Sequence, residues 1–327
     1  SIISSLPAND YSELFCDDMN DGREIANLSD YNFKLIATNA TYNFNYYSSS
    51  QGAENELTAD QISNFSNYNL VLGDNKIYVR INSNTPCYAI AELNLTLVPK
   101  PIISIQDVVP ICENNTVIID AGAGFDSYLW STGATSASII VTNPGNFDVT
   151  VTNNYSTISC SSTKTFTVKN STIATINTIE TKDWTDTENM ITVHVTGAGD
   201  FEYSIDGIHF QDSNQFLNVN SGEYTVHVRD KNGCGTVKDE VYLLMYPKFF
   251  TPNGDGYNDT WKIKFSDLET SMIIKIFDRY GKLLKELTQN NSWDGTFNGQ
   301  ELPASDYWFA VTRNNGKEYK GHFSLKR

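Results

Sequence analysis

Residues 246–264 read YPKFFTPNGDGYNDTWKIK, and this glycine-rich stretch is the most informative one in the chain. Asn253, Asp255 and Asp259 are spread along it among two glycines. Glycine adopts backbone angles that other residues avoid, and Asp and Asn side chains accept hydrogen bonds from the N–H groups of tight turns. The stretch therefore predicts a structured loop leading into a β-domain. The same three side chains also offer oxygen ligands for a calcium ion, and both interpretations stay open.

The residues after this loop predict β-hairpins. Residues 272–277 and 307–312 are short runs rich in Ile, Val, Phe and Tyr, bounded by Arg-Tyr-Gly, Asn-Gly and Asp-Gly turn signals. Such runs are typical of a β-sandwich. Residues 314–316, Asn-Asn-Gly, predict a turn before a last strand through His322 and Phe323. We expect an Ig-like sandwich that ends on an exposed basic pair, Lys326 and Arg327.

This segment resembles the gliding-motility-associated C-terminal domain, the type B sorting domain of the type IX secretion system of gliding Gram-negative bacteria. After the loop at 246–264, the family's motifs follow in order as IKIFDRYGK at 274–282, WDGTFNG at 293–299, LP at 302–303 and DYW at 306–308. Asp306 stands where the family usually has Gly. The resemblance implies that residues 246–327 are an export signal that docks, folded or nearly folded, on the outer-membrane translocon and its type B-specific proteins.

A folded domain presents only shape, exposed edges and charge to such machinery. We therefore expect basic side chains of the sorting domain to contact the translocon. The candidates are Lys262, Lys264, Lys275, Arg279, Lys282, Lys326 and Arg327.

The 327 residues are too many for one small sandwich and suit three or four modules of about 70 to 100 residues. The composition favours Asn, Thr, Ser, Ile and Val over the residues that form helices. It therefore predicts an all-β protein of tandem Ig-like β-sandwich modules, arranged as beads on a string. The predicted modules are 1–99 (Ig-like or cadherin-like), 100–169 (Ig-like or PKD-like), 170–245 (adhesin-repeat-like sandwich) and 246–327 (the Ig-like sorting domain).

Two of the upstream modules carry resemblances of their own. The motif YLWSTG at 128–133 resembles Ig-like or PKD-like repeats of bacterial surface proteins, and Trp130 is expected in the core. The motifs YSIDG at 203–207, GEYTVHVRD at 222–230 and NGC at 232–234 resemble a repeat of giant gliding adhesins. Pro99-Lys-Pro101 predicts a stiff linker between the first two modules.

Charge is distributed unevenly along the chain. Residues 246–327 hold 12 Lys and Arg against 10 Asp and Glu, whereas residues 1–245 hold 11 against 29, so the two parts carry +2 and −18. The acidic part disfavours nucleic-acid binding, because a phosphate backbone would be repelled. No run approaches the roughly 20 apolar residues of a membrane span. The N-terminus lacks an initiator Met and a signal-peptide pattern, so we expect a fragment of a longer precursor.

Five cysteines occur without the CxxC spacing of a zinc or redox site. Cys16 and Cys87 bracket the first module, and Cys112 and Cys160 bracket the second. Disulfides Cys16–Cys87 and Cys112–Cys160 are therefore predicted, each stabilising by roughly 4 kcal/mol in the chain-entropy model. Free thiols in apolar surroundings are the alternative. Cys234 then has no partner and is expected in a turn.

A second candidate calcium loop lies in the first module. Residues 16–22 read CDDMNDG, in which Asp17, Asp18, Asn20 and Asp21 gather oxygen ligands ahead of Gly22. This spacing does not fit an EF-hand, since Met19 would fall on a ligand position. A hydrogen-bonded Asx turn is the alternative interpretation. Calcium is the one cofactor for which the sequence offers ligands.

Catalytic patterns have little support. The four histidines are His194, His209, His227 and His322, and two of them alternate with Val in predicted strands. The sequence has no HExxH motif, no GxSxG elbow and no Walker loop. We therefore expect no enzymatic activity in these residues and no catalytic residue.

These observations favour the C-terminal region of a secreted or cell-surface bacterial adhesin, exported through the periplasm and the outer membrane. One alternative is that the same tail belongs to a secreted polysaccharide-degrading enzyme with its catalytic domain before Ser1. Another is that one Ig-like module binds carbohydrate, which would make surface glycans a partner.

Overall fold

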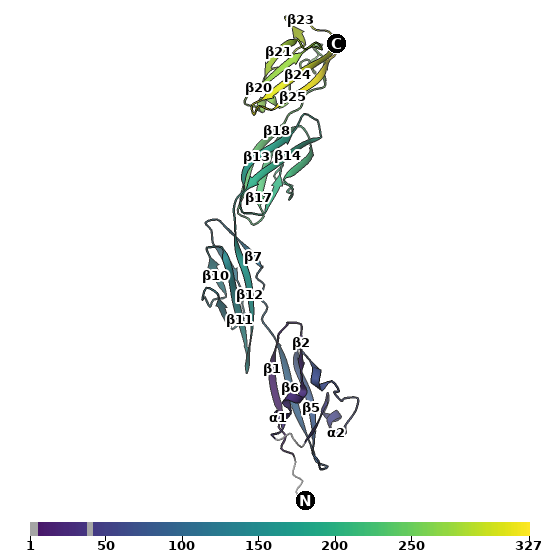
Figure 1. The fold of residues 1–327 in the computed structure, drawn as a ribbon, viewed down its shortest axis with the longest axis vertical. Helices are drawn as coiled ribbons and strands as arrows, with labels where there is room; N and C mark the ends of the chain where they lie inside the picture. Colours follow the sequence, from purple (N-terminus) through teal and green to yellow (C-terminus); the bar gives the residue numbers. More distant parts are fainter. Residues whose placement is uncertain (1–5, 38–41) are drawn as a thin grey trace. The chain divides into compact units, whose positions relative to one another are not determined.

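The computed structural model describes residues 6–37 and 42–327, which form small β-sheets with a few short helices (Figure 1). We keep the four predicted ranges as modules 1 to 4. The contacts divide the chain into two compact units, and each is described by itself. One unit comprises modules 1 and 2 except residues 110–115, and the other comprises modules 3 and 4 together with those residues. The predicted all-β class of Ig-like sandwiches is confirmed.

Module 1 is built on a four-stranded sheet in the order β1-β6-β5-β3, in which β1 runs parallel to β6. A two-stranded sheet of β2 and β4 accompanies it. Apolar residues alternate along β5 and β6, so that Ile77, Val79, Leu93 and Leu95 are fully buried in one core. The elements are β1 (Tyr11–Asp17), β2 (Arg23–Ala26), η1 (Leu28–Tyr31), α1 (Asn32–Leu35), β3 (Asn43–Tyr47), α2 (Ser50–Asn55), η2 (Phe65–Asn67), β4 (Tyr68–Val71), β5 (Gly73–Asn82) and β6 (Tyr88–Pro99).

Module 2 has one sheet in the order β7-β12-β11-β9 and a second of β8 and β10. Trp130 is only 2% exposed and its indole N–H donates to the carbonyl of Ser136 at 2.7 Å, as expected for a core tryptophan. The strands are β7 (Val108–Cys112), β8 (Val117–Asp120), β9 (Ser127–Trp130), β10 (Ser138–Val141), β11 (Gly145–Tyr155) and β12 (Ile158–Ser171).

Module 3 contains two three-stranded sheets, in the orders β13-β14-β16 and β15-β17-β18. Val193 from the first sheet and Val226, Val228 and Leu243 from the second are buried in a common core. The strands are β13 (Thr175–Lys182), β14 (Asn189–Thr196), β15 (Phe201–Ser204), β16 (Gln215–Val219), β17 (Gly222–Asp230) and β18 (Thr236–Leu243).

Module 4 is dominated by a five-stranded sheet in the order β19-β25-β24-β20-β21. The runs predicted at 272–277 and 307–312 form β20 and most of β24, and the predicted last strand is β25. An aromatic core that includes Trp261, Trp293, Phe309 and Phe323 fills the inner side of this sheet. The elements are β19 (Phe249–Phe250), η3 (Ser266–Leu268), β20 (Met272–Phe277), β21 (Leu283–Thr288), β22 (Thr296–Phe297), β23 (Gln300–Glu301), β24 (Ser305–Arg313) and β25 (Glu318–Leu325).

The disulfides correct the predicted pairing. Cys16 bonds to Cys160, which joins module 1 to module 2, and Cys112 bonds to Cys234, which joins residues 110–115 to module 3. The pairs Cys16–Cys87 and Cys112–Cys160 are wrong, and so is the expectation that Cys234 lacks a partner. Among the described residues Cys87 is the free cysteine.

Strand register explains why the bonds do not close within modules. Cys16 lies opposite Val98 on β6, so Cys87, 11 residues before Val98, is roughly 35 Å away along the strand. A disulfide requires Cα atoms within about 7 Å. Likewise Cys160 lies near the start of β12, whereas the N–H of Glu113, next to Cys112, donates to the carbonyl of Ser171 at the end of that strand.

Candidate functional site

The glycine-rich loop of module 4 is organised by one carboxylate. Asp259 accepts hydrogen bonds from the backbone N–H groups of Asn253, Gly254 and Gly256 at 3.0, 2.7 and 2.8 Å. Gly254 and Gly256 have φ values of 77° and 87°, in the left-handed region that glycine adopts without strain. The hydrogen bonds from Gly254 and Gly256 lower the pKa of Asp259. The loop thus has the geometry of a turn held by hydrogen bonds from backbone N–H groups to Asp259.

The loop at 16–22 follows the same principle. Asp17 is 2% exposed and accepts from the N–H groups of Asp21 and Gly22 at 3.2 and 2.7 Å. Asp18 pairs with the Lys100 ammonium at 2.6 Å, and the Asn20 side chain accepts from the Lys100 N–H. These contacts tie the loop to the linker that leads into module 2.

The seven calcium ligand candidates therefore have hydrogen-bonding or ionic partners in the protein, which include backbone N–H groups for the carboxylates of Asp17, Asp21, Asp255 and Asp259. Within residues 6–37 and 42–327, no group of three or more His, Cys, Asp or Glu side chains is placed to hold a metal ion. Calcium binding by Asp17, Asp18, Asn20 and Asp21, or by Asn253, Asp255 and Asp259, stays a prediction.

All seven basic candidates for translocon contact are exposed. Lys275 lies on the outer side of β20, and Arg279 and Lys282 follow in the turn to β21. Lys262 and Lys264 flank the buried Ile263 in the segment after the glycine-rich loop. At the chain end, the Lys326 ammonium lies over the Phe249 ring and Arg327 pairs with Glu301. The candidates are thus spread over separate segments of module 4.

Module 3 contributes a tryptophan to the core of module 4. Trp184 is 8% exposed, and its ring stacks on Tyr319 with 4.3 Å between ring centroids and 7° between planes. Its backbone N–H donates to the Leu244 carbonyl at 2.8 Å. Trp184 has a φ of 85°, a conformation that costs a non-glycine residue about 1–3 kcal/mol. The stacking and burial offset this strain, so the junction fixes module 4 against module 3.

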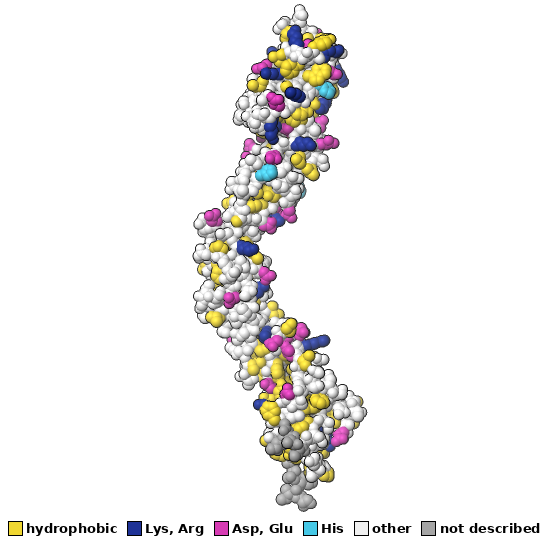
Figure 2. Space-filling model, viewed as in Figure 1, with side chains coloured by type: hydrophobic (Ala, Val, Ile, Leu, Met, Phe, Trp, Pro, Cys, Tyr) yellow, Lys and Arg dark blue, Asp and Glu magenta, His cyan; other side chains and the backbone are white. Residues whose placement is uncertain are grey.

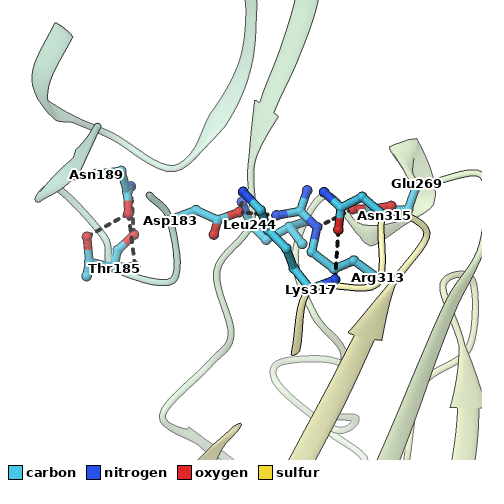
Figure 3. A network of polar contacts seen from close by, with 8 residues as sticks. All are labelled: Asp183, Thr185, Asn189, Leu244, Glu269, Arg313, Asn315 and Lys317. Atoms are coloured by element: carbon cyan, nitrogen blue, oxygen red, sulfur yellow. Dashed lines mark hydrogen bonds and ion pairs between the residues drawn. The ribbon is translucent and has the colours of Figure 1, made fainter. Parts of the chain in front are cut away.

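A buried ionic cluster completes this junction (Figure 3). Arg313, at the end of β24, donates to Asp183 of module 3 at 2.8 Å and to Glu269 at 2.5 Å. Asp183 also accepts from the N–H of Leu244 at 3.1 Å. The side chains of Arg313, Asp183 and Glu269 are 10%, 5% and 0% exposed. The second Glu269 oxygen has no hydrogen-bond partner in the described part of the chain.

Burial and pairing oppose each other in this cluster. Burial raises the pKa of Asp183, and the positive charge of Arg313 offsets part of that shift. Burial would lower the pKa of Arg313, but the carboxylates of Asp183 and Glu269 raise it above its ordinary value. Arg313 therefore supplies the positive charge that two buried acidic side chains share at the junction.

Residues 244–325 match the family described as the CHU_C type IX secretion signal domain. Module 4 is a type IX secretion signal domain. The match begins at Leu244, two residues before the predicted start, and Leu244 is fully buried in the core of the secretion signal domain. The protein is accordingly exported to the cell surface or secreted. None of the helices in the described residues is long and apolar enough to span a membrane.

Module 1 matches a second family. Residues 12–101 match the Flavobacterium inter-domain disulphide bond domain. Cys16 lies within this range, and its partner Cys160 lies outside it in module 2. The Cys16–Cys160 disulfide is therefore an inter-domain bond, in agreement with the description of this family.

The chain is also similar to solved structures of immunoglobulin domains. Sidekick-1 immunoglobulin domains 1–5 are 12% identical over 98% of this chain and 79% of that chain, with a TM-score of 0.28. The N-terminal eight Ig domains of Down Syndrome Cell Adhesion Molecule are 15% identical over 93% of this chain and 45% of that chain, with a TM-score of 0.23. A comparison with curated proteins found no match.

Sequence reasoning did not identify Trp184, Arg313 or Glu269 as residues of the junction. Asp183 and Trp184 stand directly after a strand, and Arg313 precedes an Asn-Asn-Gly turn, which is a common place for exposed residues. Asp183 and Arg313 are 130 residues apart in sequence. The one local feature of the sequence that could have indicated this junction is a tryptophan at the end of a strand of alternating polar and apolar residues.

Proposed function

We propose that this chain is part of a bacterial cell-surface adhesin of the gliding-motility type, and that its secretion signal domain docks in a folded state on the outer-membrane translocon. The observation that carries the docking proposal is the closed aromatic core of module 4, which is completed by Trp184 of module 3. A domain so packed presents its outer surface, and not an extended peptide, to a receptor.

The adhesin part of the proposal is supported by the construction of the upstream modules. Three Ig-like modules precede the signal, and disulfides join module 1 to module 2 and residues 110–115 to module 3. Disulfides form in oxidising compartments such as the periplasm and the cell surface. Such braced modules suit a protein that carries binding surfaces away from a membrane.

Export and adhesion are tested separately. Full-length protein and a form lacking residues 244–327 are expressed in a host with type IX secretion, and the surface and extracellular fractions are measured by immunoblot. The proposal expects export of the first only. Purified protein is then tested for binding to host cells, polysaccharide surfaces and glycan arrays.

The adhesion results distinguish the alternatives. Binding to a surface without turnover supports an adhesin, and binding confined to soluble glycans supports a carbohydrate-binding module. Release of reducing sugars from polysaccharide by the protein would contradict the proposal in favour of a secreted polysaccharide-degrading enzyme.

A further inference from the structure

The outer side of the large sheet in the secretion signal domain carries an ordered set of exposed side chains. Strand register places Phe277, Trp308 and His322 in one row across β20, β24 and β25. The next row is Lys275, Ala310 and Lys320. Adjacent strands are about 4.8 Å apart, so each row spans roughly 10 Å. A small residue, Ala310, thus lies between two lysines and beside an aromatic row.

This arrangement forms a hollow on the sheet surface. Its volume is about 640 Å³, and its lining includes Lys275, Phe277, Trp308, Ala310, Lys320 and His322. Trp308 is 42% exposed, which is unusual for the largest apolar side chain. Trp308 also lines a second hollow together with Arg279 and Asp306. The tryptophan therefore stands between two hollows with basic residues around it. Figure 2 shows Lys and Arg side chains interspersed with hydrophobic ones over this module.

Charged side chains of both signs surround Trp308. Lys275, Lys320 and Arg279 line the two hollows, against Glu318 in the first and Asp306 in the second. Asp306 accepts a hydrogen bond from the Ser324 hydroxyl at 2.5 Å, and Glu286 lies opposite Lys275 in the register of β20 and β21. Lys275 and Lys320 have no ion pair with a described residue. They are consequently available to a ligand that carries carboxylates.

Module 3 leaves this face uncovered. Its contacts with the secretion signal domain are made through Arg313, Tyr319 and Tyr246, on the inner side and at one end of the sheet. Tyr319 and Lys320 are neighbours on β25 whose side chains point to opposite sides of the sheet. Module 3 therefore contacts Arg313, Tyr319 and Tyr246, while Trp308, Lys275 and Lys320 remain exposed.

We infer that this face, defined by Lys275, Phe277, Trp308, Ala310, Lys320 and His322, is the docking surface for an acidic polypeptide segment of the outer-membrane secretion machinery. Carboxylates of that segment pair with Lys275 and Lys320, and an apolar side chain packs against Trp308. Tryptophan is enriched at the centres of protein interfaces, and complementary charges around such a centre steer the encounter of two partners. The inference rests on the proposed function and narrows the contact to one side of the domain.

The test uses export of the full chain in a host with type IX secretion. The variants are Trp308→Ala, Trp308→Phe and the double change Lys275→Glu with Lys320→Glu. Matched controls within the same domain are Tyr257→Ala, which removes an aromatic ring that is 77% exposed, and Lys285→Glu with Lys317→Glu, which reverses two exposed cations outside this face and outside the seven candidates for translocon contact. Melting temperatures of the purified proteins show whether each variant folds.

The expected result is a roughly tenfold or greater fall in the exported fraction for Trp308→Ala and for the charge reversal, equivalent to about 1.4 kcal/mol of lost binding. Trp308→Phe is expected to recover most of the export. The controls are expected to export normally, and all variants to melt within a few degrees of the parent chain. The charge reversal changes only exposed side chains, so it keeps the test valid if Trp308→Ala is unstable.

Three results would overturn the inference. Normal export of folded face variants, while removal of residues 244–327 abolishes export, would refute this docking surface and leave the proposed function intact. An equal loss for Lys285→Glu with Lys317→Glu would show that the overall charge of the domain, not this face, is recognised. Binding of polygalacturonate to the purified proteins is measured in parallel. Normal export of a face variant that has lost this binding would assign the face to an anionic glycan. If removal of residues 244–327 itself leaves export normal, the proposed function fails.

Discussion

Replacing Arg313 by Met should strongly destabilise the junction between module 3 and the secretion signal domain. The substitution leaves the carboxylates of Asp183 and Glu269, which are 5% and 0% exposed, without their cation. Removing one partner of a buried ion pair typically costs about 3–5 kcal/mol. For a domain of this size we expect a fall in melting temperature of more than about 10 °C.

The loss of stability in the Arg313→Met variant should depend on pH in a defined direction. Without Arg313, burial holds the pKa of Asp183 above that of the unfolded chain, so the folded state binds more protons. The free energy of unfolding of the variant should then rise as pH falls from 7 toward 5, by up to about 1.4 kcal/mol per pH unit. In the parent chain Arg313 offsets part of the shift of Asp183, so its stability should change less. The difference in free energy of unfolding between the parent chain and the variant should therefore narrow as pH falls from 7 to 5.

Scanning calorimetry of the full chain at pH 7, 6 and 5 measures both effects. Lys317→Met is a matched control, since it removes an exposed cation that lies four residues after Arg313, at the end of the turn between β24 and β25. The triple change Arg313→Met, Asp183→Asn and Glu269→Gln should recover most of the lost stability. A melting temperature of Arg313→Met within about 2 °C of the parent, or a gap that is constant with pH, would refute the reasoning.

Three further predictions concern the disulfides, Trp184 and the glycine-rich loop. Proteolysis of unreduced protein should yield Cys16–Cys160 and Cys112–Cys234 linked peptides by mass spectrometry, whereas a peptide that joins Cys87 to another cysteine would contradict the structure. Each bond closes a long segment, of 144 and 122 residues, and should stabilise by roughly 5 kcal/mol in the chain-entropy model. Trp184→Ala should cost about 3–5 kcal/mol by calorimetry and lower the melting temperature of the secretion signal domain, and an unchanged transition would show that module 3 is not part of that core. Asp259 has a depressed pKa, so its stabilising hydrogen bonds should persist above about pH 4 and weaken below it. Asp259→Ala should therefore differ from the parent chain at pH 6 and approach it near pH 2, and a calorimetric titration with calcium in parallel shows whether the loop also binds the ion.

Local pattern was sufficient to predict the strands of the secretion signal domain. In β20 and β24, buried and exposed residues alternate, so residues 272–277 and 307–312 were recognisable from composition and turn signals alone. The same period also placed Trp308 on the side opposite Tyr307 and Phe309. This alternation shows which side of its strand each residue of the proposed docking face occupies. Only the strand order shows that Lys275 and Lys320 flank Ala310.

Contacts between distant segments were not predictable in the same way. The disulfide pairing depends on which residue of β6 lies opposite Cys16, and no local pattern in the sequence contains that register. The junction cluster joins Asp183 to Arg313 across 130 residues, and each side chain stands beside a turn where solvent exposure is the ordinary expectation. The family resemblance identified the domain but not the residue that module 3 contributes to it.

The most direct test of the central claim is the fate of the full chain when residues 244–327 are removed in a host with an active type IX system. The account predicts that the parent protein reaches the cell surface or the medium, while the truncated protein stays inside the outer membrane. Equal extracellular amounts of the two proteins, at equal expression and without cell lysis, would contradict it.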